Sequence, residues 1–159
     1  MNQPRPATKR DMPRVLELIK ELAHFEKEPD AVEITLKDLE TDGFGSQPKF
    51  KCFVIEVEDR VEGLALVYPR YSTWKGEALH LEDLIVSQSN RGKNLGTKLL
   101  DKVVKYGKDL GVKRISWEVL DWNEPAIKFY ESKGANVMRD WDVVQLDDKG
   151  IETYLKNIN

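Results

Sequence analysis

Cysteine and histidine are scarce in this chain. Its 159 residues include one cysteine, Cys52, and two histidines, His24 and His80. A single cysteine cannot form a disulfide within one chain, and three such side chains are too few for a four-ligand zinc site of cysteine and histidine. The sequence therefore predicts no metal site, and Cys52 is expected to be a buried core thiol.

Long apolar runs and an excess of basic charge are also missing. No stretch approaches the ~18 uncharged apolar residues that a membrane helix needs, and residues 1–5 lack the apolar segment of a signal peptide. Lysine and arginine number 25 against 28 acidic residues, a net charge of −3, whereas nucleic-acid-binding domains typically carry a basic excess. These absences predict a cytoplasmic protein with neither a membrane nor a nucleic-acid partner.

What is present suits one globular domain. Apolar residues make up 40% of the chain, which is enough for a single core at this length. There is no internal repeat and no long linker. We therefore expect one domain that spans residues 1–159.

Periodicity and turn residues predict the order of the elements. Helices with apolar spacing begin after the capping residues Thr8 and Thr35. A tight hairpin is expected at Asp59 and Arg60 between two β-rich runs. We expect helices near 12–23, 36–43, 99–110 and 124–133 and strands near 51–58, 61–71, 77–86, 114–120 and 141–146, while 151–158 fits either type. This order indicates an α/β fold with a mixed sheet.

The polar loop before the third long helix is the first candidate site. It contains glycine and leads into the helix, so several backbone N–H groups point outward at the positive end of the helix dipole. Arg91, Lys93 and Lys98 add positive charge. The pattern is typical of phosphate binding, although a solvated basic turn has the same composition.

Arg91-x-x-Asn94-x-Gly96 resembles the pyrophosphate loop of the GCN5-related N-acetyltransferases, whose pattern is Arg/Gln-x-x-Gly-x-Gly/Ala. Asn94 replaces the first glycine, and asparagine is the next most tolerant residue of the left-handed region. The resemblance extends over residues 5–11, 84–86, 123–130 and 133–135. Segments 18–23, 42–45, 81–83 and 122–125 are most similar to the diamine (spermidine/spermine) and thialysine branch of that family.

The resemblance implies a twisted mixed sheet flanked by helices and acetyl-CoA as the acetyl donor. By resemblance, Arg91 leads into the pyrophosphate loop, and Asn123 and Ala126 lie along the cofactor. The backbone of Leu84, Ile85 and Val86 carries the pantetheine arm, and a backbone N–H at a strand irregularity there polarises the thioester. The remaining cofactor-binding residues implied in this way are Gly92, Lys93, Asn94, Leu95, Gly96 and Thr97.

Tyr130 is the candidate acid that protonates the departing thiolate, and it is also implied to contact the cofactor. It falls seven residues after Asn123, about two helical turns, so both lie on roughly one helix face. A phenol with a pKa of ~10 can donate to a thiolate of comparable basicity. The alternative is that Phe129 and Tyr130 only pack the helix on the sheet.

Glu82 is the candidate base or amine anchor. Strict alternation along the strand places His80 and Glu82 on one face and Asp83 on the other. A carboxylate inside an apolar strand is costly unless it has a partner or a task. The alternative is an acid at a sheet end that pairs with arginine or lysine.

Further acidic and aromatic residues match the acceptor groove of the diamine branch. By resemblance, Phe25, Glu26, Glu82, Asp83, Trp117 and Glu118 bind the acceptor. Another acid of that groove has no match, because Arg139 and Asp140 occupy its region. A solvated loop is the alternative for Glu26.

The sequence therefore predicts direct transfer of acetyl from acetyl-CoA to a primary amine in a ternary complex. The expected acceptor is a small cationic molecule: a polyamine, thialysine or a lysine-like amine. A homodimer is implied by the resemblance alone. Two alternatives stay open: acetylation of a peptide or protein amine, and an acetyl-CoA-binding module without turnover, which the replacement at Asn94 suggests.

Overall fold

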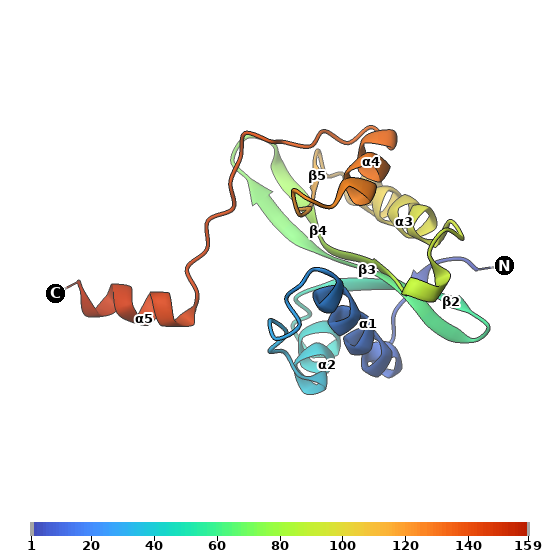
Figure 1. Ribbon diagram of the computed structural model, residues 1–159, viewed down its shortest axis with the longest axis horizontal. Helices are drawn as coiled ribbons and strands as arrows, with labels where there is room; N and C mark the ends of the chain where they lie inside the picture. The colour runs from blue at the N-terminus through green and yellow to red at the C-terminus, as the bar shows by residue number, and fades with distance from the viewer. Residues whose placement is uncertain (1, 159) are drawn as a thin grey trace. The chain divides into compact units, whose positions relative to one another are not determined.

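The computed structural model describes residues 2–158 (Figure 1). Its contacts divide the chain into two compact units, one that ends at Glu118 and one that begins at Val119. The first holds β1 (Arg5–Pro6), α1 (Met12–Phe25), α2 (Leu36–Phe44), β2 (Lys51–Val57), β3 (Arg60–Ser72), β4 (Gly76–Val86), α3 (Leu95–Leu110) and β5 (Ile115–Ser116), with single 3₁₀ turns at Lys9–Asp11 and Gln88–Asn90. The second holds α4 (Glu124–Ser132) and α5 (Asp148–Lys156).

The first unit is built on one five-stranded sheet in the order β1-β2-β3-β4-β5. The first four strands pair antiparallel, and β5 pairs parallel to β4. This confirms the predicted α/β fold with a mixed sheet. The turn between β2 and β3 falls at Glu58 and Asp59, both with positive φ, as two-residue hairpins require. It lies one residue earlier than the sequence predicts.

Helices cover both faces of this sheet, with α1 and α2 on one side and α3 on the other (Figure 1). On the first side, Met12 and Val15 of α1 and Leu39 of α2 share a buried core with strand residues such as Leu64 and Leu66. On the other side, Phe53 of β2 meets Tyr106 of α3 edge to face, with 5.3 Å between the ring centroids. Burial of apolar side chains on both faces therefore fixes where the strand ends lie.

Local capping signals are reproduced in the structure. At α2, the Thr35 hydroxyl accepts a hydrogen bond from the Asp38 amide at 3.2 Å, and the Asp38 carboxylate accepts one from the Thr35 amide at 2.7 Å. This reciprocal pair confirms the helix start that the sequence predicts. None of the helices within residues 2–158 is long and apolar enough to cross a membrane.

Two predicted strands differ from the structure. The strand expected over 114–120 is short, because only Ile115 and Ser116 pair with β4. The strand expected near 141–146 is wrong, since those residues adopt neither helix nor strand. A strand forms only where its backbone finds a partner, and along this run Trp141, Val143 and Val144 are exposed.

The second unit begins with a capped helix. The Asn123 side chain accepts a hydrogen bond from the Ala126 amide at 3.4 Å, and Pro125 occupies the first turn of α4. Further along, Asp147 caps α5 by accepting from the Gly150 amide at 2.7 Å. The segment that the sequence left open between helix and strand is thus helical up to Lys156.

Candidate functional site

A β-bulge in β4 determines which of its polar side chains share a face of the sheet. Leu66 on β3 pairs with Asp83 and the next residue, Val67, pairs with Leu81, so Glu82 is the extra residue of the bulge. Tyr68, two residues after Leu66, pairs with His80.

Residues two apart on a strand face the same way, and directly paired residues share a face. His80 and Asp83 therefore lie on the same face, together with Leu66 and the α1–α2 core. The expectation that Asp83 lies opposite His80 is wrong, because the bulge resets the alternation. The strand irregularity also falls at Glu82, whereas Leu84 and Ile85 pair regularly with β3.

Glu82 holds an accessible carboxylate at this bulge. Its Oε2 accepts a hydrogen bond from the Tyr68 hydroxyl at 3.1 Å, and the same oxygen lies 3.6 Å from Nε2 of His80. The Glu82 side chain is 53% exposed. Among the residues that the structure describes, no lysine or arginine forms an ion pair with Glu82. The alternative, in which Glu82 is a structural acid paired with arginine or lysine, is therefore not supported.

His80 is buried beside this carboxylate. Its Nδ1 lies 3.0 Å from the Ser116 hydroxyl and 3.3 Å from Nη1 of Arg70. Because a guanidinium only donates, Nδ1 is the acceptor and Nε2, near Glu82, carries the hydrogen. Burial lowers the pKa of His80, and Arg70 acts in the same direction against the charge of Glu82. The ring is therefore neutral at pH 7.

Two more carboxylates belong to the same region. Burial raises the pKa of Asp83 to about 6, and the charges of Glu82 and Glu26 act in the same direction. Burial also raises the pKa of Glu26, which follows α1 directly. The charge of Glu118 raises the pKa of both Tyr68 and His80, although burial is the largest influence on each. Four of the six predicted acceptor residues thus belong to one electrostatically connected group around Tyr68 and His80: Glu26, Glu82, Asp83 and Glu118.

Phe25, the predicted acceptor residue on α1, contacts the predicted phosphate loop. The Arg91 guanidinium lies 4.8 Å from the centroid of the Phe25 ring, and its Nε donates to the Val86 carbonyl at 3.3 Å. A cation over an aromatic face is attracted by the ring quadrupole. The sixth residue, Trp117, directly follows β5 in the chain.

The loop itself has the backbone that phosphate binding needs. Gly92 has φ 79° and Asn94 has φ 64° and ψ 14°, so Asn94 adopts the left-handed conformation in place of glycine. Within residues 2–158, the amides of Leu95, Gly96 and Thr97 donate to no backbone carbonyl. These free donors at the N-terminus of α3 fit an anion such as pyrophosphate.

Lys93 of the loop and Lys98 in the first turn of α3 both donate hydrogen bonds to neutral groups. Lys93 Nζ donates to Asn90 Oδ1 at 2.8 Å, and Lys98 Nζ donates to the Asn2 carbonyl at 3.0 Å. In the part of the chain that the structure describes, neither forms an ion pair with a carboxylate. Their charges therefore remain uncompensated beside the loop.

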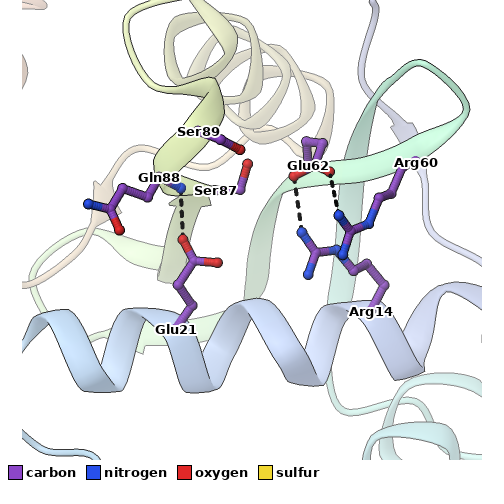
Figure 2. Close-up of a pocket in the computed structure, with 7 residues that line it drawn as sticks. All are labelled: Arg14, Glu21, Arg60, Glu62, Ser87, Gln88 and Ser89. Carbon is purple, nitrogen blue, oxygen red and sulfur yellow. Dashed lines mark hydrogen bonds and ion pairs between the residues drawn. The ribbon is translucent and has the colours of Figure 1, made fainter.

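A polar cavity lies where the loop leaves β4 (Figure 2). The Gln88 amide donates to Glu21 Oε1 of α1 at 2.7 Å, and the Ser87 amide donates to the Glu62 carbonyl at 2.8 Å. The Glu62 carboxylate pairs with Arg14 at 3.0 Å. The lining residues are Arg14, Glu21, Arg60, Glu62, Ser87, Gln88 and Ser89. The start of the loop is thus fastened to both α1 and β3.

Sequence reasoning missed this cavity, although one signal was available. Glu62 sits in the apolar run Val-Glu-Gly-Leu-Ala-Leu-Val and is buried, so the argument that singled out Glu82 applies to it as well. Burial pushes the pKa of Glu62 upward, and hydrogen bonds from Ser87 and Arg14 more than offset it, so the pKa is lowered. Glu62 is therefore a satisfied structural anion.

The other predicted cofactor residues lie in the second unit. Asn123 is the N-cap of α4 and accepts from the amide of Ala126, as described above, and Tyr130 follows on the same helix. The rings of Phe129 and Tyr130 are 5.4 Å apart and tilted by 57°. Tyr130 thus has an aromatic neighbour within its own helix.

Comparison with known proteins gives consistent results. The model of the acetyltransferase (GNAT) family matches residues 13–135. Thialysine N-epsilon-acetyltransferase of Bos taurus is 39% identical over 139 residues, 82% of each chain. Human spermidine/spermine N(1)-acetyltransferase-like protein 1 is 37% identical over 140 residues, 84% of this chain and 20% of that protein.

Solved structures share the fold. An integron cassette protein from the mobile metagenome of V. cholerae superimposes with a TM-score of 0.80 over 98% of both chains, at 22% identity. At that identity the likeness concerns the fold alone.

Proposed function

This chain belongs to the acetyltransferase (GNAT) family, and from that premise we propose that it acetylates the primary amine of a small cationic acceptor. The donor is acetyl-CoA, and the acceptor is a polyamine, thialysine or a lysine-like amine. The observation that carries the proposal is the gathering of Glu82, Asp83 and Glu26 about the β4 bulge. Besides burial, the charges of Glu82 and Glu26 raise the pKa of Asp83, and a bound cation stabilises such a group of carboxylates.

The loop between β4 and α3 supplies the donor site in this proposal. Free amides at the start of α3 receive the pyrophosphate, and the uncompensated charges of Lys93 and Lys98 complement it. The backbone of Leu84, Ile85 and Val86 carries the pantetheine arm. Asn123 and Ala126 on α4 complete the set.

Glu82 handles the proton of the amine. A primary amine has a pKa of ~10 and must lose a proton before it attacks. Glu82 is exposed and hydrogen-bonded to Tyr68, which directs its carboxylate and leaves one oxygen for the acceptor. Glu82 takes this proton from the ammonium, either directly or through a water, and the free amine nitrogen then bonds to the carbonyl carbon. The second proton, which the nitrogen loses as the amide forms, passes to solvent, from which the phenol of Tyr130 is restored after the reaction.

Tyr130 completes the reaction. The carbon–sulfur bond breaks as the new carbon–nitrogen bond forms, and the departing thiolate takes the phenolic proton of Tyr130. No acetyl-enzyme is formed. This direct transfer needs no nucleophilic side chain, which agrees with a Cys52 thiol that is buried and whose pKa burial raises to about 12.

We also propose a homodimer. In support, apolar residues of the second unit are exposed, among them Trp141, Val143 and Val144, which form no strand within their own chain. Exposed apolar side chains that lie close together in the chain are a typical feature of association sites. Sedimentation or light scattering at micromolar concentration tests this assembly.

The proposed reaction is tested by a thiol-release assay with acetyl-CoA. The panel comprises polyamines, thialysine, lysine, aminoglycosides and peptides. Turnover of the small cationic amines supports the proposal, and preference for peptides favours the peptide acetyltransferase. Measurable CoA binding without turnover of any amine would instead identify an acetyl-CoA-binding module.

A further inference from the structure

Arg70 and Ser116 determine which nitrogen of the buried His80 ring accepts a hydrogen bond. Nη1 of Arg70 lies 3.3 Å from Nδ1 of His80 and 3.4 Å from the Ser116 hydroxyl. That hydroxyl lies 3.0 Å from the same Nδ1. The guanidinium can only donate, so the Ser116 oxygen accepts from Arg70 and its hydrogen is left to donate to Nδ1. Both neighbours of Nδ1 are thus donors.

The other nitrogen of the ring faces the proposed base. Nε2 of His80 lies 3.6 Å from Oε2 of Glu82, which also accepts from the Tyr68 hydroxyl at 3.1 Å. Because Nδ1 is an acceptor, the ring presents an N–H and no net charge to this carboxylate. An imidazolium ring would place a positive charge at the same position.

The charges around His80 come from three segments of the first unit. They belong to Arg70 on β3, Glu82 on β4 and Glu118 just after β5, and the Tyr68 ring on β3 lies 5.2 Å from the imidazole, centroid to centroid. Burial is the largest influence on the pKa of His80 and lowers it, whereas the two carboxylates raise it. Arg70 is the cation that opposes them. Without Arg70, both carboxylates would favour the imidazolium unopposed by a positive charge.

We propose that Arg70 is a positioning residue that occupies Nδ1 of His80, prevents an imidazolium from forming beside Glu82, and so keeps that carboxylate active as the base below pH 7. This inference rests on the proposed acetyltransferase function. A neighbouring imidazolium would lower the affinity of the carboxylate for a proton and would repel the ammonium group of the acceptor. Arg70 acts through His80 and exchanges no proton itself, because a guanidinium stays protonated in proteins.

The protonation of His80 can be observed by NMR without any assay of activity. The chain has two histidines, so His24→Gln leaves a single imidazole to assign. Long-range proton–nitrogen correlation should show the hydrogen on Nε2 in the otherwise unmodified protein. Arg70→Met removes the donor and the charge, and it should move the titration of His80 to higher pH. A hydrogen on Nδ1 before the change, or an unmoved titration after it, would overturn the inference.

Kinetics of the same variant test the consequence for Glu82. We compare kcat/KM for spermidine between Arg70→Met and the unmodified protein at pH 8.5 and pH 6. The ratio of the two values should fall about tenfold between these pH values, because the imidazolium forms only in the variant. Arg70→Lys keeps a cationic donor and should restore most of the loss. A ratio that is the same at both pH values would contradict an action through His80.

Arg114→Met is the matched control. Nη1 of Arg114 also donates to a serine hydroxyl, that of Ser72 at 3.3 Å, and the replacement removes the same charge. Within residues 2–158 no hydrogen bond joins Arg114 to His80. We expect this variant to leave the titration of His80 and the pH dependence of kcat/KM unchanged. A shift equal to that of Arg70→Met would reduce the effect of Arg70 to general electrostatics and overturn the positioning role.

The failure of the inference is distinguishable from the failure of the proposed function. Turnover with an unmoved His80 titration in Arg70→Met overturns the inference and leaves the acetyltransferase proposal intact. If no amine is turned over, calorimetric binding of spermidine decides instead. Weaker binding to Arg70→Met at pH 6 but not at pH 8.5 supports the role of Arg70, and equal binding to both proteins at both pH values overturns it.

Discussion

The guanidinium of Arg91 lies 4.8 Å over the ring of Phe25. Arg91 belongs to the loop that precedes α3, and Phe25 is the last residue of α1. Residues 66 positions apart in the chain thus meet at the boundary between the proposed donor and acceptor sites. The contact gives the two sites a direct physical connection.

Removing this ring should weaken the donor site. Phe25→Leu keeps an apolar side chain but deletes the cation–π attraction, which contributes about 0.5–1 kcal/mol at exposed positions. We expect the KM for acetyl-CoA to rise roughly two- to fivefold. Phe44→Leu, at the end of α2, is the control. An unchanged KM would show that Arg91 is held by the Val86 carbonyl alone.

Glu21 of α1 is expected to hold the loop between β4 and α3 in position. Its carboxylate accepts the Gln88 amide at 2.7 Å, and a hydrogen bond to a charged group contributes about 1.5–3 kcal/mol. Glu21→Ala should therefore raise the KM for acetyl-CoA about tenfold with little effect on the KM for the amine. Glu40→Ala on α2 provides a comparison. Equal changes in both KM values would contradict a specific role in the donor loop.

Tyr130→Phe should lower kcat and leave CoA affinity nearly unchanged. The phenylalanine keeps the ring and removes only the proton that the thiolate receives. Loss of a general acid typically costs about a hundredfold or more in rate. Steady-state kinetics together with calorimetric CoA binding separate the two effects, and Tyr154→Phe on α5 serves as control. An unaltered kcat would assign Tyr130 to packing.

Glu82→Gln should reduce kcat/KM most at low pH, where the amine is hardest to deprotonate. Glutamine still accepts the Tyr68 hydroxyl but cannot take a proton. We expect kcat/KM to fall about a hundredfold near pH 7. The loss should become smaller as the pH approaches the pKa of the free amine. Glu77→Gln, on the same strand, is the control. A loss that is uniform across pH would indicate positioning of the amine instead.

Asp83→Asn should stabilise the protein above pH 6. Burial raises the pKa of Asp83 from 3.8 to about 6, so the unfolded state ionises more readily than the folded one. Stability contributed by the protonated form is therefore lost as the pH rises from about 4 to about 6. The asparagine variant escapes that loss, which is at most about 3 kcal/mol.

Urea unfolding at pH 4 and pH 7.5 measures this difference. The variant should match the unmodified protein at pH 4 and exceed it at pH 7.5. The same change removes a charge from the acceptor site, so kcat/KM for a cationic amine should fall. If the variant and the unmodified protein had the same free energy of unfolding at both pH 4 and pH 7.5, Asp83 would ionise as readily in the folded protein as in the unfolded one.

Local signals in the sequence predicted the structure well. The cap formed by Thr35 and Asp38 and the left-handed tolerance of Asn94 depend only on neighbouring residues. They were readable because the interactions close within one turn of chain.

Features that depend on distant partners could not be read in the same way. The bulge at Glu82 is a property of the register between β3 and β4, and a single strand gives no sign of where its partner will skip a residue. The strand near 141–146 was predicted from its composition, but residues with high β-propensity pair only when an edge is available to them.

The bulge at Glu82 makes the site sensitive to the length of β4 rather than only to its composition. Deleting one residue there would restore regular alternation, and every residue on one side of the deletion would then turn to the opposite face. The side chains of Leu84 and Ile85 would each move to the other face of the sheet, and the loop that follows them would shift with them. Evolution and engineering can therefore vary the side chains around this strand, but a single-codon deletion within it should abolish the fold of the site.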